Sequence, residues 1–99
     1  MGRRVKVAGD LFHGQVPAGA VYIGRAAPGL PRSPFANPFP VKVYGRKNSE
    51  IMYRQYLCDN PDLIDRAIQE IGDADVACWC KPTDWCHGDV LLPAMAARR

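Results

Sequence analysis

The chain has 99 residues, of which 47% are apolar and 23% are charged, and its net charge is +3. This length supports one modest hydrophobic core, so we expect a single domain over residues 1–99. The composition excludes a disordered chain, and no apolar run reaches the roughly 20 residues that cross a bilayer. Because the basic start lacks an apolar signal segment, we expect a cytoplasmic protein without membrane partners. Its cysteines should then be reduced, which favours a metal site or a reactive thiol over disulfides.

The charges are divided unevenly along the chain. Residues 1–49 contain eight lysines and arginines against a single acid, whereas residues 50–99 contain five basic and nine acidic side chains. The basic half favours an anionic partner such as a nucleotide or a nucleic acid. An unevenly charged but merely solvated surface explains the same pattern equally well.

Short strands are predicted in the N-terminal half. Apolar and polar residues alternate over residues 4–8, and an apolar, β-branched run indicates a buried strand over residues 20–24. Five of the nine prolines lie between residues 26 and 40, which excludes a helix and indicates a long loop. Residues 41–44 are predicted to add a short edge strand.

The C-terminal half is predicted to be mainly helical. A first helix begins at residue 48 or 49, and a second runs from Pro61 to a stop at Gly72, with Asn60 as its cap. A strand over residues 74–79 leads to a last helix over residues 87–97. Together these elements predict an α/β domain of two or three layers.

The run from Cys78 to Asp89 concentrates the reactive side chains of the chain. It holds three of the four cysteines and one of the two histidines. On an extended strand Cys78 and Cys80 point to the same face, while Cys86 and His87 open the last helix. All four groups can therefore converge in space.

This cluster has three interpretations. The first is a zinc site made by Cys78, Cys80, Cys86 and His87, although adjacent ligands at 86 and 87 fit the usual spacing poorly. The second is a reactive thiol, because a helix N-terminus lowers the pKa of a cysteine such as Cys86. The third is plain core packing for Cys78 and, with more reason, for Cys58.

A second group of residues surrounds the long loop. Arg25 follows the strand at 20–24 and is placed to grip a phosphate or a carboxylate. Asn37 precedes a proline, which restricts its backbone and holds its amide in one direction. The alternative is a rigid structural loop whose Phe35 and Phe39 fill the core.

Both groups resemble the family called domain of unknown function 4326 (DUF4326), over residues 5–97. That family typically consists of small stand-alone proteins of bacteriophages, actinobacteria and other bacteria, and a phage-encoded member would lie in the host cytoplasm. The resemblance implies a small Rossmann-like domain with a short, mostly parallel sheet flanked by helices, and it assigns no function. The matching runs are Val21-Tyr22-Ile23-Gly24-Arg25, Ser33-Pro34-Phe35-Ala36-Asn37-Pro38-Phe39, Cys78-Trp79-Cys80-Lys81-Pro82 and Cys86-His87-Gly88-Asp89-Val90-Leu91.

The segment from Cys80 to His87 also resembles domain of unknown function 488. There a strand-end cysteine precedes a Cys-His pair that opens a helix, which favours Cys80, Cys86 and His87 and makes Cys78 more expendable. The chain departs from the pattern in its longer loop after Cys80 and in Pro93, which is expected to kink or delay the last helix.

We therefore expect a pocket at the carboxyl ends of the strands for a nucleotide-like or other anionic small molecule. The alternatives are a zinc-stabilised, non-catalytic module that binds nucleic acid or protein, and a metal-free nucleic-acid binder. Both an enzyme and a zinc cofactor are compatible with these residues, and Asp89 is expected to orient His87 or to accept a hydrogen bond from the ligand. The expected ligand-binding residues are Arg25, Ser33, Asn37 and Lys81, and the expected catalytic residues are Cys80, Cys86, His87 and Asp89.

Overall fold

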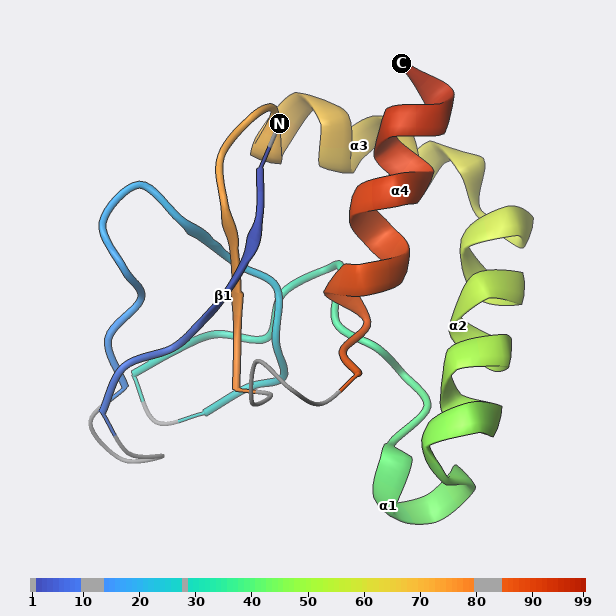
Figure 1. Ribbon diagram of the computed structural model, residues 1–99, viewed down its shortest axis with the longest axis horizontal. Coiled ribbons are helices and arrows are strands. Elements are labelled where there is room, and N and C mark those ends of the chain that lie inside the picture. Colours follow the sequence, from blue (N-terminus) through green and yellow to red (C-terminus); the bar gives the residue numbers. More distant parts are fainter. Residues whose placement is uncertain (1, 10–13, 28, 80–84) are drawn as a thin grey trace.

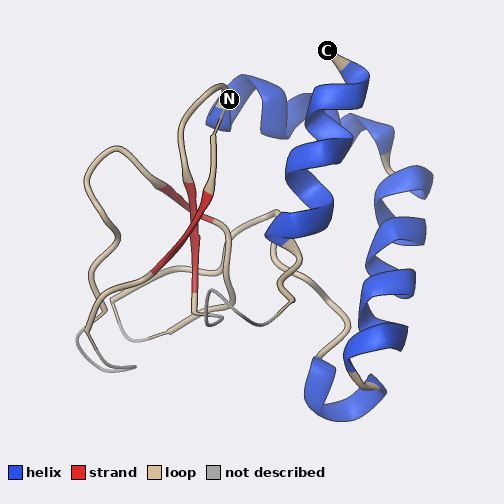
Figure 2. Cartoon of the chain, viewed as in Figure 1, coloured by secondary structure: helices blue, strands red, loops and turns tan. Residues whose placement is uncertain are grey.

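A computed structural model describes residues 2–9, 14–27, 29–79 and 85–99 (Figures 1 and 2). The described residues form a small parallel sheet and four helices, which confirms the predicted mixture of strands and helices. The strands are β1 (Arg4–Lys6), β2 (Val21–Tyr22) and β3 (Val76–Cys78), and the helices are α1 (Val41–Tyr44), α2 (Arg46–Asp59), α3 (Pro61–Ile71) and α4 (Gly88–Arg98).

The sheet has the order β1-β3-β2, and β3 pairs in parallel with both neighbours. All three residues of β3 are buried, because the strand is covered at both edges and on both faces. Hydrogen bonding continues past the strand ends, where the Val7 N–H donates to the Cys78 carbonyl and the Ile23 N–H to the Ala77 carbonyl, each at 2.9 Å. The three carboxyl ends therefore meet at one edge of the sheet.

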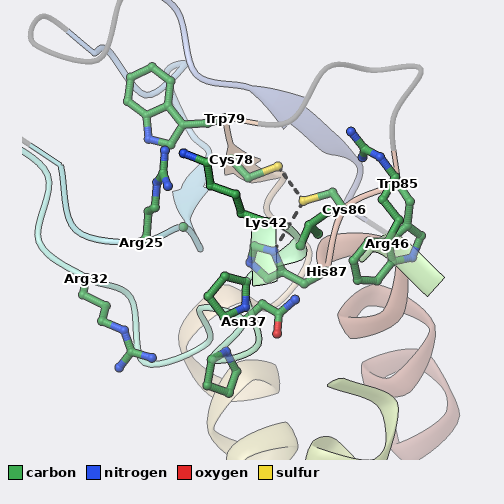
Figure 3. Close-up of a pocket in the computed structure, with 14 residues that line it drawn as sticks. Arg25, Arg32, Asn37, Lys42, Arg46, Cys78, Trp79, Trp85, Cys86 and His87 are labelled. Atoms are coloured by element: carbon green, nitrogen blue, oxygen red, sulfur yellow. Dashed lines mark hydrogen bonds between the residues drawn. The ribbon is translucent and has the colours of Figure 1, made fainter. Parts of the chain in front are cut away.

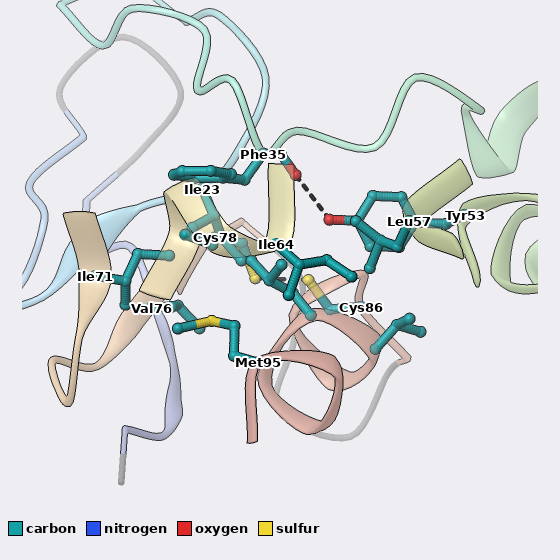
Figure 4. Close-up of a cluster of buried hydrophobic side chains, with 13 residues drawn as sticks. Ile23, Phe35, Tyr53, Leu57, Ile64, Ile71, Val76, Cys78, Cys86 and Met95 are labelled. Atoms are coloured by element: carbon teal, nitrogen blue, oxygen red, sulfur yellow. Dashed lines mark hydrogen bonds between the residues drawn. The ribbon is translucent and has the colours of Figure 1, made fainter. Parts of the chain in front are cut away.

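The helices gather on one side of the sheet, and long loops occupy the other side (Figure 1). α4 packs against both α2 and α3. The core fills the space between the sheet and the helices (Figure 4). Its largest fully buried side chains are Tyr53, Phe35, Ile23, Leu57, Leu91 and Met95.

Residues 41–44 form the short helix α1, so the predicted edge strand is wrong. The Pro40 carbonyl accepts hydrogen bonds from the N–H groups of Val43 and Tyr44, and Gly45 donates to the Val41 carbonyl at 2.8 Å. None of the α1 residues is buried. The alternating pattern therefore has no core face to cover, and local hydrogen bonds decide the conformation. Gly45, at φ 81°, then separates α1 from α2.

The longer helices follow the predicted pattern with shifted ends. α2 begins at Arg46, less than one turn before the expected start at residue 48 or 49. It buries Tyr53 and Leu57, as its apolar face predicts. α3 runs from Pro61 to Ile71 and ends at Gly72, whose φ of 59° is left-handed.

The last helix and the strands also differ from the prediction at their ends. α4 begins at Gly88 and contains Pro93, so the delayed start is wrong. The strands are shorter than predicted, because pairing is limited to the residues beside β3. In the described part of the chain, no helix combines the length and the apolar content needed to cross a membrane.

Truncation of Leu57 tests this core. Leu57 is 2% exposed, whereas Ile51 on the same helix is 52% exposed. Leu57→Ala should lower the free energy of unfolding by about 2–5 kcal/mol through lost burial and an unfilled cavity. Ile51→Ala should change it by less than about 0.5 kcal/mol. Urea unfolding followed by tryptophan fluorescence measures both, and equal losses would contradict the observed orientation of α2.

Candidate functional site

A cavity of about 660 Å³ lies at the carboxyl ends of β2 and β3 (Figure 3). Its wall combines these strand ends, the proline-rich loop, α1, the start of α2 and the segment that enters α4. This volume falls within the range typical of small-molecule sites. The cavity lies where open parallel sheets bind their ligands, as the sequence predicted.

Basic side chains dominate the polar part of the cavity wall. Arg25 and Arg32 come from the loop after β2, Lys42 from α1 and Arg46 from the first turn of α2. Among the described lining residues none is acidic. A concave surface lined by charges of one sign concentrates the opposite ion, so this cavity favours anions.

Cys78 and Cys86 place their sulfur atoms side by side at the floor of the cavity. Their Sγ atoms are 2.8 Å apart, and each residue is only 1% exposed. Cys78 lies at the end of β3, and Cys86 precedes α4 by two residues. Cys78 is buried as predicted, but its contact with Cys86 makes it part of the site and not an expendable neighbour.

His87 is held by the backbone of β2. Its Nε2 is 2.7 Å from the carbonyl oxygen of Ile23. A carbonyl only accepts hydrogen bonds, so Nε2 carries the proton and donates it. Burial lowers the pKa of His87, which keeps the ring neutral and leaves Nδ1 as an acceptor. The edge-on ring of Tyr53, with centroids 5.5 Å apart, supports this orientation.

The free Nδ1 of His87 faces the Cys86 thiol. Cys86 Sγ lies 3.5 Å from this atom, so the S–H group donates to an imidazole nitrogen that has no other proton. A thiol, a base and a group that orients the base are the parts of an activated nucleophile. Sequence reasoning identified the first two, but the carbonyl of Ile23 emerges only from the fold.

Arg4 and Asp89 complete the electrostatic surroundings of the thiols. Asp89 Oδ2 accepts a hydrogen bond from the Cys86 N–H at 3.1 Å, and Oδ1 lies 3.2 Å from Arg4 Nε. Burial alone would lower the pKa of Arg4, but a hydrogen bond with Cys78 and the charge of Asp89 raise it overall. Arg4 therefore stays cationic beside the thiols and stabilises their thiolate forms.

The partners of Asp89 differ from His87, the side chain that it was expected to orient. Its carboxylate bonds the backbone at the entry to α4 and pairs with Arg4, whereas the His87 ring is oriented by Ile23. The physical reason is direction, since the first turn of the helix points this side chain back toward its own N-terminus.

The predicted ligand-binding residues separate into different roles. Arg25 lines the cavity as expected. Asn37 also lines it, but its amide donates to Ser49 Oγ at 2.8 Å and accepts from the Phe39 N–H at 2.9 Å. Ser33 is buried, and its Oγ accepts from the Phe35 N–H at 3.1 Å. Asn37 and Ser33 therefore stabilise the loop, as the structural alternative proposed.

The predicted Cys80 and Lys81 lie outside the described residues. The zinc interpretation fits the other three groups poorly. Two thiolates on one zinc ion stand about 3.8 Å apart, from bonds of about 2.3 Å in a tetrahedron, whereas Cys78 and Cys86 are 2.8 Å apart. Within the described ranges no three histidine, cysteine or acidic residues are arranged to hold a metal. Cys58 is exposed, so its predicted core position is wrong.

Two tryptophans flank the cavity. The Nε1–H of Trp79 donates to the Tyr22 hydroxyl at 2.9 Å, and that hydroxyl in turn donates to the Arg25 carbonyl. A Cβ on Gly24 would lie 2.6 Å from the Tyr22 hydroxyl oxygen, so only glycine fits beneath this ring. This chain of contacts fixes the backbone from which Arg25 projects. Trp85 lines the cavity beside Cys86.

The sequence did not single out Arg32, Lys42 and Arg46 as site residues. Their common signal was the excess of basic residues before position 50, which indicated an anionic partner without a position. Lys42 lies on α1 and Arg46 on α2, so the two residues line one cavity because of the turn at Gly45 that joins these helices.

The buried neutral His87 should make stability depend on pH. Its pKa is lowered by folding, so below the unfolded value of about 6.5 the unfolded state binds a proton that the native state excludes. The free energy of unfolding should therefore fall from pH 7.5 to pH 5.5, with a slope of up to about 1.4 kcal/mol per unit below pH 6.5. His87→Gln should flatten this slope, as measured by urea unfolding at each pH. An unchanged slope would show that His87 titrates normally.

Comparison with known proteins agrees with the resemblance seen in the motifs. Residues 12–97 match the family described as domain of unknown function (DUF4326). An uncharacterized protein of Acanthamoeba polyphaga mimivirus is 35% identical over 86 residues, which cover 73% of this chain and 63% of that protein. This chain thus spans less than two thirds of the length of this relative. No solved structure matches this chain. With a match over most of its length, the chain belongs to the DUF4326 family.

Proposed function

We propose that this chain binds a small molecule that carries phosphate groups, such as a nucleotide, in the cavity at the end of the sheet. The observation that carries the proposal is that four basic residues, Arg25, Arg32, Lys42 and Arg46, line one cavity. The planar guanidinium groups of the arginines suit bidentate contacts with phosphate oxygens, and Lys42 supplies a point charge.

The aromatic side chains favour a nucleotide over inorganic phosphate. Trp79 and Trp85 both line the cavity, and either indole offers a flat surface on which a base can stack. The cavity volume of about 660 Å³ is larger than a phosphate group alone would need.

The arrangement also favours a small ligand over a nucleic acid. The four basic side chains line one cavity, whereas a nucleic-acid strand needs a groove that follows its backbone. On the same basis we propose that the fold is Rossmann-like, because a parallel sheet places the cavity at the carboxyl ends of its strands.

Nucleotide binding can be measured by isothermal titration calorimetry. Affinity should increase from adenosine through its monophosphate to its triphosphate, because each phosphate adds charge near the basic wall. A parallel series with guanosine tests the base. Lys42→Ala combined with Arg46→Ala should weaken triphosphate binding at least tenfold, since each lost charged hydrogen bond is worth about 1.5–3 kcal/mol.

The matched control combines Lys47→Ala with Arg54→Ala. It removes the same charges from exposed positions of α2 that do not line the cavity. Binding should stay within about twofold of the unmodified chain, because exposed charges at a distance are screened by salt. Equal losses in both double variants, or equal affinity for nucleoside and nucleotide, would overturn the proposal. Tighter binding to a single-stranded oligonucleotide, falling steeply with salt, would favour the nucleic-acid alternative.

A further inference from the structure

The thiol pair at the cavity floor has a geometry that ligand binding alone does not require. Cys78 and Cys86 lie on either side of residues 80–84, which are outside the described residues. Their Sγ atoms are nevertheless 2.8 Å apart. A disulfide bond is about 2.0 Å long, so the two sulfurs need to approach by less than about 1 Å to form one. Both residues line the cavity, although they are buried from bulk water.

The surroundings distinguish the two sulfurs. Cys86 Sγ faces the unprotonated Nδ1 of His87 at 3.5 Å and precedes the N-terminus of α4. The base and the positive end of the helix dipole both favour a thiolate at this position. Cys78 lies at the end of β3, where its Sγ is 2.8 Å from the Cys86 sulfur and can reach it (Figure 3). Cys86 is therefore placed to attack a substrate, and Cys78 to attack Cys86.

We propose that Cys78 and Cys86 are a redox-active thiol pair that reduces an anionic disulfide bound in the cavity. The substrate class rests on the proposed function, since the same basic residues that attract phosphate would attract the carboxylates of such a disulfide. Arg25 and Arg32 project from the loop beside the thiols, and Lys42 and Arg46 lie on the facing helices.

The exchange proceeds in two balanced steps. The Cys86 thiol gives its proton to His87 Nδ1, and its sulfur attacks one sulfur of the substrate disulfide. The substrate S–S bond breaks, and the leaving thiolate takes the proton from His87, which leaves a mixed disulfide on Cys86. Cys78 then loses its proton through the same imidazole and attacks the Cys86 sulfur. The second substrate thiol leaves with that proton, so one substrate disulfide becomes two thiols while the protein pair becomes a disulfide.

The reduced full-length chain provides the test, in a Cys58→Ser background that removes the exposed thiol. It is incubated separately with glutathione disulfide, which is anionic, and with hydroxyethyl disulfide, which is neutral. Free thiols are then alkylated, and peptide mapping by mass spectrometry locates the links. We expect a bond between Cys78 and Cys86, formed at least tenfold faster with the anionic disulfide. Adding Lys42→Ala and Arg46→Ala should reduce that preference, because only Arg25 and Arg32 of the basic lining residues remain.

Single variants identify the order of attack. Cys78→Ser should trap glutathione on Cys86, whereas Cys86→Ser should prevent both the mixed and the internal disulfide. Cys80→Ser should still allow the 78–86 bond to form, which excludes Cys80 as the required partner. Circular dichroism checks that each variant folds. If a variant fails to fold, the Cys78–Cys86 bond mapped without that substitution still tests the proposal.

The outcomes separate this inference from the proposed function. If no bond between Cys78 and Cys86 forms at any ratio of glutathione to glutathione disulfide, the redox pair is overturned, whatever the chain binds. If the bond forms equally fast with both disulfides, the redox pair stands and the anionic substrate is overturned. If nucleotides also fail to bind, the proposal that the basic cavity binds anions is overturned as well.

Discussion

The hydrogen bond from His87 Nε2 to the carbonyl of Ile23 joins the start of α4 to the end of β2, and the geometry of the site depends on it. It is buried, so its loss would leave both a carbonyl and an imidazole without water to replace the partner. Because it assigns the ring proton to Nε2, it also leaves Nδ1 free to face Cys86. This one contact therefore positions the start of α4, sets the tautomer of His87 and places Nδ1 beside the Cys86 thiol.

The other groups around the site support this contact from separate elements. Tyr53 of α2 packs its ring against His87 and donates its hydroxyl to the Phe35 carbonyl at 2.9 Å, which ties the proline-rich loop to the helices. Ser49 accepts from Asn37 and donates to the Phe39 carbonyl, which fixes the same loop at its far end. The loop that carries Arg25 and Arg32 is thus anchored at two points. A basic wall whose charges are held in place before a ligand arrives costs little further ordering on binding.

The basic cavity and the thiol pair share one electrostatic feature, which is positive charge beside the sulfur atoms. Positive charge near a thiol stabilises the thiolate, and the guanidinium of Arg4 beside Cys78 acts in the same sense as the basic cavity wall. Under the two proposals above, an anionic molecule bound in the cavity would lie beside the sulfurs of Cys78 and Cys86. The DUF4326 description names no activity, and what the structure adds is the position of the thiol pair at the floor of a basic cavity.

The sequence by itself determined the helices with a clear apolar face, the stop at Gly72, the buried strand around Val76 and the importance of the Cys-His run. These features depend on local periodicity and on side-chain chemistry, which a single sequence displays. Tertiary structure alone decided that residues 41–44 form a helix instead of an edge strand, that Asn37 bonds Ser49, and that the Ile23 carbonyl holds His87. The two hydrogen bonds depend on partners that are distant in the sequence, and the helix at residues 41–44 forms where no residue is buried in the core. The pattern of apolar and polar residues along the chain indicates neither. The basic wall was decided in the same way, because its four residues share a charge but acquire a common position only in the fold.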